Sequence, residues 1–298
     1  MNSSMIFKKK SPLLVFLIPA FLFMGLFLYY PFVMNIFNSF NNIIGLGTES
    51  RGLNDPWYKN YAQMMSDPQL GTAVLNTLLM MVLTIVFQVG IALLLAILID
   101  NIRKGTQFFR IVYFFPIIIS ATALGLLFNL IFLYEDGGAG GMINQLITAF
   151  GGTPVNWKGD FSMFTMALPV MWQYIGFYFV IIVTGLNNIC PDIYEAAAID
   201  GANGFKRVRY ITMPLLHNVL CTCLVLAITG ALKIFDLPWT MFPQGMPMGK
   251  TYLTGTYMYY VTFMSKDVDY GSAIALLIVV LGVVISQIVN RVFKEKDY

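Results

Sequence analysis

Six long apolar segments dominate the pattern of hydrophobic and polar positions along the chain. They occupy residues 12–32, 72–99, 108–133, 161–186, 216–234 and 271–292. Apolar runs of about 20 residues match the thickness of a bilayer. Inside hydrocarbon the backbone must satisfy its own hydrogen bonds, so such runs form helices or a closed barrel. Because these runs are continuous rather than alternating, the pattern predicts an all-α, polytopic membrane protein with six transmembrane helices.

The composition agrees with this interpretation. Of the 298 residues, 58% are hydrophobic and 11% are charged, whereas soluble domains carry about 25% charged residues. Three lysines at positions 8–10 precede the first apolar segment, as they do in a signal peptide. That segment is longer than a signal core of about 7–15 residues, and no small-residue cleavage site follows it. We therefore expect an uncleaved first span.

The basic residues predict the orientation, because cytoplasmic loops carry an excess of Lys and Arg. With the N-terminus inside, 12 of the 18 basic residues fall inside: Lys8, Lys9, Lys10, Arg103, Lys104, Arg110, Lys206, Arg207, Arg209, Arg291, Lys294 and Lys296. Five fall outside, namely Arg51, Lys59, Lys158, Lys250 and Lys266, and Lys233 lies within the fifth predicted span. The sequence therefore predicts that both termini are cytoplasmic and that residues 33–71, 134–160 and 235–270 form the outer loops.

These spans define the expected organisation of the chain. Residues 1–71 would comprise a cytoplasmic tail, the first helix and the first outer loop. Residues 72–292 would form a core of five helices, and residues 293–298 a second cytoplasmic tail. A membrane enzyme needs a carboxylate pair, a metal cluster or a nucleophile with its base inside the spans. The spans contain no His-rich or Asp-rich set, so we expect neither an enzyme nor a metal site.

The most informative polar stretch is residues 187–213, which the charge pattern places inside. Asp192-Ile-Tyr-Glu195 has the spacing of a capping box with Asp as the N-cap. Three alanines follow and favour a helix. Gly201 can take the left-handed conformation that ends a helix, and Pro214 opens the next span. The pattern predicts two short helices joined by a bend.

Two interpretations of this loop remain open from its chemistry. An amphipathic surface helix would place its basic residues against lipid. A protein dock would present its small alanine face for close approach, with Glu195 placed to meet a basic side chain of a partner. Periodicity does not separate the two.

Several motifs resemble those of one family. Glu195-Ala196-Ala197, Asp200-Gly201-Ala202 and Ile211-Thr212-Met213-Pro214 resemble the loop signature of ABC importer permeases. Other landmarks resemble the sugar permeases of that family: Asn60-Tyr61, Asn76-Thr77, Trp172 with Gly176-Phe177, Gly185-Leu186, Phe235-Asp236 and Tyr270-Gly271-Ser272-Ala273. Cys190 stands where the family commonly has proline, Met213 replaces a leucine, and residues 243–247 depart from the usual pattern. That last departure weakens the inference about substrate more than the inference about family.

The resemblance implies a permease subunit that moves a sugar or oligosaccharide into the cytoplasm by alternating access. Its partners would be a second homologous permease, two cytoplasmic ATPases, an extracellular solute-binding protein and membrane lipid, without nucleic acid. The chain would bind no cofactor, since ATP and Mg²⁺ would be held by the ATPases. It would lie in a bacterial or archaeal cytoplasmic membrane. A permease for another small solute, such as glycerol phosphate, and a secondary transporter are the alternatives. A secondary transporter has no need of the Glu-Ala-Ala loop.

A sequence resembling a P-loop does not assign ATP hydrolysis to this chain. Gly245-Met-Pro-Met-Gly249-Lys250-Thr251 has three residues between its glycines, where the nucleotide-binding motif needs four. It also falls on the predicted outer side, away from cytosolic ATP. We expect the ATPase on separate subunits.

Two sets of candidate site residues follow. The resemblance implies an ATPase-docking loop of Glu195, Ala196, Ala197, Asp200, Gly201, Ala202 and Pro214. Polar groups are costly in hydrocarbon, so the candidates for a sugar pathway are the polar and aromatic residues Gln173, Tyr174, Phe177, Thr229, Lys233 and Asp236. They fall roughly where the family lines its pathway.

Each of these pathway candidates has a structural alternative. Lys233 and Asp236 have i,i+3 spacing and can neutralise one another on a helix. Phe177 can serve packing alone. Gln88 and Asn129 can form hydrogen bonds between helices.

Overall fold

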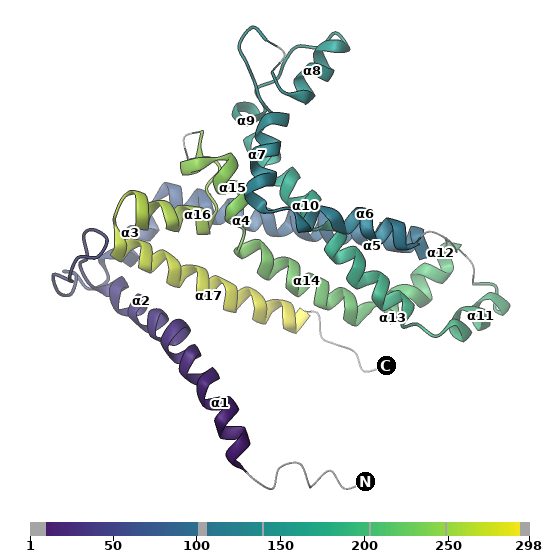
Figure 1. Ribbon diagram of the computed structural model, residues 1–298, viewed down its shortest axis with the longest axis horizontal. Helices are drawn as coiled ribbons and strands as arrows, with labels where there is room; N and C mark the ends of the chain where they lie inside the picture. The colour runs from purple at the N-terminus through teal and green to yellow at the C-terminus, as the bar shows by residue number, and fades with distance from the viewer. Residues whose placement is uncertain (1–9, 101–105, 139, 203, 248, 293–298) are drawn as a thin grey trace. The chain divides into compact units, whose positions relative to one another are not determined.

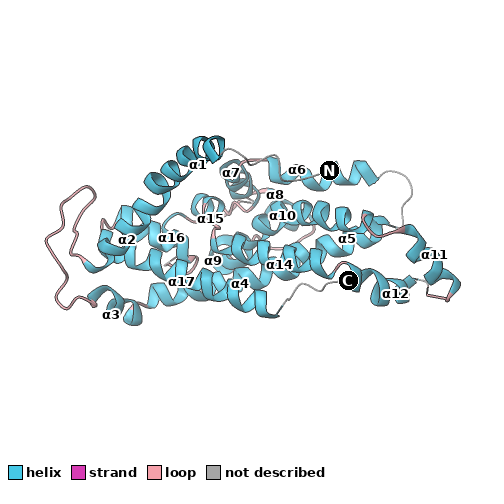
Figure 2. Cartoon of the chain, turned by 90° about the horizontal axis from the view of Figure 1, so that it is seen from below, coloured by secondary structure: helices cyan, strands magenta, loops and turns pink. Residues whose placement is uncertain are grey.

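The computed structural model describes residues 10–100, 106–138, 140–202, 204–247 and 249–292. The predicted N- and C-terminal tails, together with Arg103 and Lys104, lie outside the described residues. The described part is helical, and its only β pairings are two isolated bridges. Among these residues, five helices are long and apolar enough to cross a membrane. A bent helix pair makes a sixth if it counts as one span. The predicted all-α fold is confirmed (Figures 1 and 2).

The chain divides into two compact units. The first comprises Met1–Ser66 and Met258–Leu277, and the second comprises Asp67–Tyr257 and Ile278–Tyr298. In the first unit, α1 (Lys10–Met24), a π-helical turn (Gly25–Tyr29) and α2 (Tyr30–Phe40) follow one another, and α3 spans Lys59–Ser66. The first part of α17 (Val268–Val292) also belongs to this unit. The first helical segment thus extends to Phe40, beyond the predicted boundary at residue 32.

A buried carboxylate organises the first unit. Asp269, which is 5% exposed, accepts hydrogen bonds from the Nδ2 atoms of Asn60 at 3.2 Å and Asn54 at 3.4 Å. The same Asn60 nitrogen donates to the Ser39 carbonyl at 3.0 Å, and the Tyr61 hydroxyl lies 2.8 Å from the Ser39 hydroxyl. Asn60-Tyr61 therefore joins the start of α3 to the end of α2 and to α17.

The neighbouring Asp267 gives a prediction for pH dependence. Burial, followed by a hydrogen bond and repulsion from Asp269, raises its pKa from 3.8 to about 6, and Lys59 opposes this. The folded state therefore binds the proton more tightly than the unfolded state does. The contribution of the protonated Asp267 to the free energy of unfolding is therefore complete below pH 3.8. It is lost as the pH rises through about 6.

Asp267→Asn should accordingly flatten the dependence of the unfolding temperature on pH between 4 and 6. The measurement is thermal unfolding of the purified chain in detergent across that window. Asp160→Asn, at an exposed position, is the matched control and should keep the wild-type slope. An unchanged slope in Asp267→Asn would contradict the assignment.

The second unit contains the larger helical core. Its helices are α4 (Pro68–Leu83), α5 (Gly90–Asp100), α6 (Thr106–Ile118), α7 (Ala121–Ile131), α8 (Met142–Ala149), α9 (Trp157–Asp160), α10 (Ser162–Asn187), α11 (Pro191–Ile199), α12 (Gly204–Arg207), α13 (Met213–Leu215), α14 (His217–Leu232), α15 (Asp236–Met241) and α16 (Thr254–Tyr259). A π-helical turn, Thr84–Val89, joins α4 to α5. The central helix α10 packs along α5 and α6 (Figure 1).

Two predicted spans are broken. The third, expected as one helix over 108–133, is the bent pair α6 and α7, whose axes differ by 93°. Ser120 is extended at φ −60° and ψ 142°, and its hydroxyl accepts a hydrogen bond from the Ala123 amide. It therefore starts a new helix. Pro116, which lacks an N–H, weakens the helix just before the break.

The fifth span is interrupted near its predicted end at residue 234 and continues to Met241. Helix α14 stops at Leu232, and α15 begins at Asp236 after a non-helical Phe235 at φ −140°. Lys233 and Asp236 therefore do not share one helix, as the structural alternative for these two residues required. The two residues flank the short non-helical stretch between α14 and α15.

The Asn76-Thr77 landmark holds the segment that leads into α16. Asn76 Nδ2 donates to the carbonyls of Lys250 at 2.7 Å and Tyr252 at 2.9 Å. The Thr77 hydroxyl accepts from the Thr254 amide at 3.0 Å. These bonds fix residues 250–254 against α4.

Candidate functional site

The loop between α10 and α14 folds as two short helices. Helix α11 ends at Ile199 with Asp200 as its C-cap, and Gly201 has φ +77°. The Gly201 amide donates to Ala198 O at 3.1 Å, and the Ala202 amide donates to Ala197 O at 2.8 Å. This pair of bonds is the Schellman motif, which favours glycine at the left-handed position. The predicted bend at Gly201 is confirmed.

The start of α11 differs from the prediction. Cys190 is the N-cap and makes no side-chain capping bond, Pro191 is the first helical residue, and Asp192 lies inside the first turn. The predicted capping box is therefore wrong. Proline at the first position loses no hydrogen bond and has its φ preset for a helix, so the helix begins before Asp192. Glu195 consequently lies beyond the N-terminal turn and caps nothing.

Tyr194 joins the two short helices. Its hydroxyl lies 3.4 Å from the Thr212 hydroxyl, and the guanidinium carbon of Arg207 lies 5.2 Å from the centre of its ring. Thr212 is buried, at 3% exposed, and ends a π-helical turn (Val208–Thr212) between α12 and α13. The second short helix is thus fixed to the first by side chains as well as by the chain.

The surface of this loop combines charge with large apolar groups. Glu195, Asp200 and Gly201 are exposed, whereas Ala197 is buried. Pro214 lies within α13. Three apolar side chains are strongly exposed: Ile199 at 87%, Phe205 at 80% and Tyr210 at 73%. The loop therefore offers a mixed charged and apolar face, which suits a protein partner better than bulk water.

A cavity of about 240 Å³ lies where several membrane helices of the second unit meet. It is lined by Thr84, Gln88, Ala121, Val170, Gln173, Tyr174, Tyr178, Ala227, Gly230, Ala231, Lys233, Ile234, Phe235, Asp236 and Leu237. These residues come from the π-helical turn Thr84–Val89, the start of α7, the middle of α10, the end of α14, the start of α15 and the stretch between those two helices. The irregular stretches of three spans thus meet at one place, as in transporters whose sites lie at broken helices.

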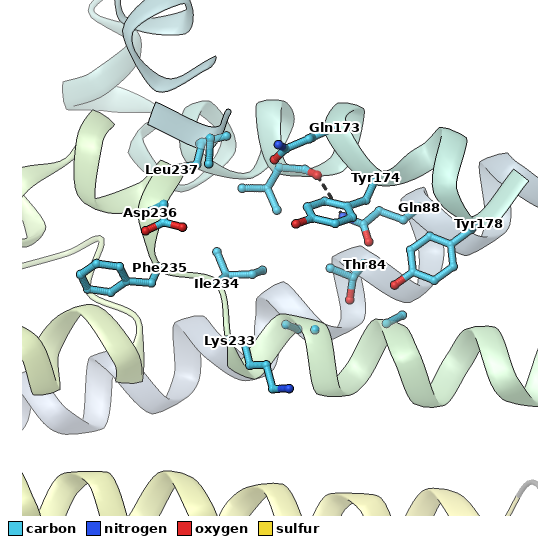
Figure 3. A pocket seen from close by; sticks show the side chains of 15 residues that line it. Thr84, Gln88, Gln173, Tyr174, Tyr178, Lys233, Ile234, Phe235, Asp236 and Leu237 are labelled. Atoms are coloured by element: carbon cyan, nitrogen blue, oxygen red, sulfur yellow. Dashed lines mark hydrogen bonds between the residues drawn. The ribbon is translucent and has the colours of Figure 1, made fainter. Parts of the chain in front are cut away.

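Hydrogen bonds hold the two glutamines of the cavity. Gln88 Nε2 donates to Val170 O at 3.0 Å, and Gln173 Nε2 donates to Ile119 O at 3.3 Å. In Figure 3 the hydroxyls of Tyr174 and Tyr178 are directed toward the cavity, with Gln88 between the two rings. The lining therefore combines amides, hydroxyls and aromatic faces.

The two charged residues of the cavity do not pair. Within the part of the chain that the structure describes, no ion pair joins Lys233 to Asp236, and Figure 3 shows the Lys233 ammonium directed away from the Asp236 carboxylate. Both side chains are exposed. Each remains available to a solute or to a neighbouring subunit.

The structure brings together four of the six pathway candidates. Gln173, Tyr174, Lys233 and Asp236 line the cavity. Phe177 packs edge-on against the Tyr178 ring at 5.2 Å, away from the lining. The Thr229 hydroxyl donates to Val225 O at 2.8 Å within its own helix.

Three polar lining residues were missed by the sequence interpretation. Thr84 and Tyr178 were not named, and Gln88 was expected only as a bond between helices. That bond exists, and so does the one from Asn129 Nδ2 to Thr240 O at 3.3 Å. The i,i+4 spacing of Thr84 and Gln88 within an apolar span was the available signal. No cluster of His, Cys, Asp or Glu that could hold a metal is found among the described residues.

The comparisons with known proteins agree with this arrangement. Residues 88–296 match the family described as "Binding-protein-dependent transport system inner membrane component". The chain is 31% identical over 286 residues to the probable ABC transporter permease protein YurN of Bacillus subtilis (strain 168), covering 94% of this chain and 95% of that protein. It is 29% identical over 287 residues to the arabinooligosaccharides transport system permease protein AraP of the same organism, covering 95% and 88%.

A solved structure shares the fold. The chain superposes on a chain of a bacterial ABC transporter involved in the import of the acidic polysaccharide alginate, with a TM-score of 0.82, 20% identity and 96% of each chain covered. The family is a membrane transport component rather than an enzyme, and the ATPase of such a transporter is on separate subunits. The chain belongs to the family of binding-protein-dependent inner membrane transport components and is an ABC transporter permease.

Proposed function

We propose that the chain is the membrane-spanning permease subunit of an importer that moves a sugar or oligosaccharide into the cytoplasm. The observation that carries this proposal is the cavity lined by Gln88, Gln173, Thr84, Tyr174 and Tyr178. Amides and hydroxyls match the hydroxyl groups of a sugar, and aromatic rings match its apolar faces. Burying such polar groups inside a membrane costs free energy, so their presence there indicates a functional site.

The charge of the cavity supports a neutral solute. Its lining contains one cation, Lys233, and one anion, Asp236, and these charges balance. Glycerol phosphate would bring an excess of negative charge that one lysine beside an aspartate does not neutralise. The printed name of the AraP relative, an arabinooligosaccharides permease, also supports a sugar over that alternative.

The partners follow from the family and from the exposed surfaces. A second homologous permease would complete the pore, an extracellular solute-binding protein would deliver the sugar, and two cytoplasmic ATPases would hold ATP and Mg²⁺. The docking loop of Glu195, Ala196, Ala197, Asp200, Gly201, Ala202 and Pro214 would face those ATPases. Both termini would then be cytoplasmic, in a bacterial or archaeal cytoplasmic membrane.

Alternating access would pass from this loop to the cavity through two helices. The loop leaves α10 at Asn187 and continues into α14 at His217. The cavity is lined by α10 and by the far end of α14. Because Tyr194 fixes the two short helices to each other, movement of the ATPases would carry the loop as a rigid body. The tilt of α10 and α14 would then open or close the cavity.

Co-purification and uptake test this proposal. The chain, expressed together with its candidate partner subunits, should retain a different permease and an ATPase. Vesicles containing this complex and the binding protein should accumulate labelled arabinotriose, but not glycerol 3-phosphate, only when ATP is supplied. Uptake by vesicles that contain this chain alone, without ATPase or ATP, would instead identify a secondary transporter.

Lys233 and Asp236 give a sharper test of the cavity. Because they form no ion pair, Lys233→Met and Asp236→Asn should each leave membrane abundance unchanged while lowering uptake. The double variant should not recover uptake, since independent sites add to within about 0.5 kcal/mol. Abundance and uptake are measured for the three variants, with exposed Lys250→Met as the control. Recovery in the double variant would show a structural pair after all.

A further inference from the structure

Lys158 joins the segment 134–160, predicted to form an outer loop, to α15, the short helix whose first residues line the cavity. The Lys158 ammonium of α9 donates to the carbonyl of Met241 at 2.9 Å, and it lies 5.4 Å from the centre of the Phe242 ring. Met241 and Phe242 are 1% and 4% exposed. Burial lowers the pKa of Lys158, as expected for an ammonium held away from water. A cation at this position stabilises the unpaired carbonyls at the C-terminal end of α15.

The lysine stands on a firmly built segment. Asn144 of α8 is fully buried, and its Nδ2 donates to Val155 O at 3.0 Å and to Leu133 O at 3.2 Å. Its Oδ1 accepts from the Trp157 indole and the Val155 amide, both at 3.0 Å. Figure 1 shows α8 and α9 in one segment beyond the end of α7. Asn144 therefore ties α8 directly to Val155 and to Trp157, the first residue of α9.

The other end of the contact is equally firm. Helix α15 lies so close to α7 that a Cβ on Gly125 would be 2.8 Å from the Cβ of Thr240. Asn129 of α7 also donates to the Thr240 carbonyl at 3.3 Å. The first residues of α15, Asp236 and Leu237, line the cavity, whereas its last residue, Met241, meets Lys158. One six-residue helix thus joins the cavity to the segment that carries Lys158.

We propose that Lys158 is a positioning residue that couples the segment 134–160 to the cavity through α15. A displacement of this segment, such as the docking of a solute-binding protein would produce, moves the ammonium and with it the end of α15. The helix transmits the displacement to Asp236 and Leu237. The lining of the cavity therefore changes when the segment 134–160 moves. This coupling rests on the proposed function, in which that segment faces the binding protein.

The first arm of the test does not depend on the transported sugar. Hydrogen exchange is measured on the full-length chain in nanodiscs for the wild type, Lys158→Met, Lys158→Arg and the control Lys250→Met. Lys158→Met should speed exchange at the amides of residues 233–242 and leave α10 and α14 unchanged. Lys158→Arg should keep the wild-type rates because it retains the cation. Unchanged exchange at residues 233–242 in Lys158→Met would overturn the positioning role.

The second arm measures coupling in the assembled transporter in vesicles. ATP turnover is followed against the concentration of the binding protein. Lys158→Met should lower the maximal stimulated rate to near the basal rate. Basal turnover and the half-maximal concentration of binding protein should stay within about 2-fold of wild type, and Lys158→Arg should restore stimulation.

The outcomes separate the inference from the proposed function. Full stimulation in Lys158→Met, or an equal loss of basal and stimulated turnover, would overturn the coupling role. A wild-type complex that the binding protein does not stimulate would count against the proposed function, while the exchange experiment would still decide whether Lys158 positions α15.

Discussion

Gly201→Val is expected to leave the chain inserted in the membrane while separating ATP hydrolysis from transport. Gly201 has φ +77°, and an added Cβ would meet nothing within 4 Å. The substitution therefore introduces no clash, and its effect is conformational. A left-handed backbone costs an L-residue about 1–2 kcal/mol, with β-branched side chains the least tolerant. The chain would relieve that strain by changing the angle between α11 and the second short helix, which lies far from the cavity.

The measurement is retention of the ATPase and ATP hydrolysed per sugar moved in reconstituted vesicles. Gly201→Asn is the matched control, because asparagine enters the left-handed region more readily than other residues. It should keep most of the coupling. Glu195→Ala should weaken retention more mildly, since Glu195 is exposed and caps no helix. Wild-type coupling in Gly201→Val would show that the loop is a lipid-facing surface helix.

The membrane helices could be predicted because burial in hydrocarbon leaves a strong and local signal. The apolar runs at 72–99 and 161–186 correspond closely to α4 through α5 and to α10. The break at Ser120 leaves no such signal, because a serine inside an apolar run changes hydropathy little while changing the backbone direction by 93°. The start of α11 was misjudged for a related reason. Both Pro191 and Asp192 favour helix starts, and sequence alone does not rank them.

The loop between α10 and α14 was more predictable than the cavity. Gly201 and the alanines act through short-range backbone preferences, and such preferences can be inferred from the residues next to them in the sequence. The cavity depends on the rotation of each helix about its axis, and one residue along a helix corresponds to a rotation of about 100°. Tyr178 lines the cavity where Phe177 was expected, and Gly230 where Thr229 was expected. Both errors are one position, which hydropathy cannot resolve when most sides of a span are apolar.

Gly176→Ala should lower the stability of the folded chain more than the addition of one methyl group at any other position in α10. A Cβ at Gly176 would overlap the carbonyl oxygen of Tyr113 and lie 2.7 Å from the Phe114 amide nitrogen. These are backbone atoms of α6, so no side-chain rotation relieves the overlap. Overpacking costs about 1–3 kcal/mol when side chains can adjust, and here two helices must move apart. Gly176→Val should abolish the folded protein.

The measurement is membrane abundance together with the unfolding temperature of the purified chain in detergent. Gly71→Ala is the matched control, because a Cβ there meets nothing within 4 Å and alanine is the better helix former by about 0.5–1 kcal/mol. It should unfold at or above the wild-type temperature. A wild-type unfolding temperature in Gly176→Ala would mean that α6 is not held against α10. Since α6 ends at the bend that leads to Ala121 in the cavity wall, that result would also remove the support for one side of the cavity.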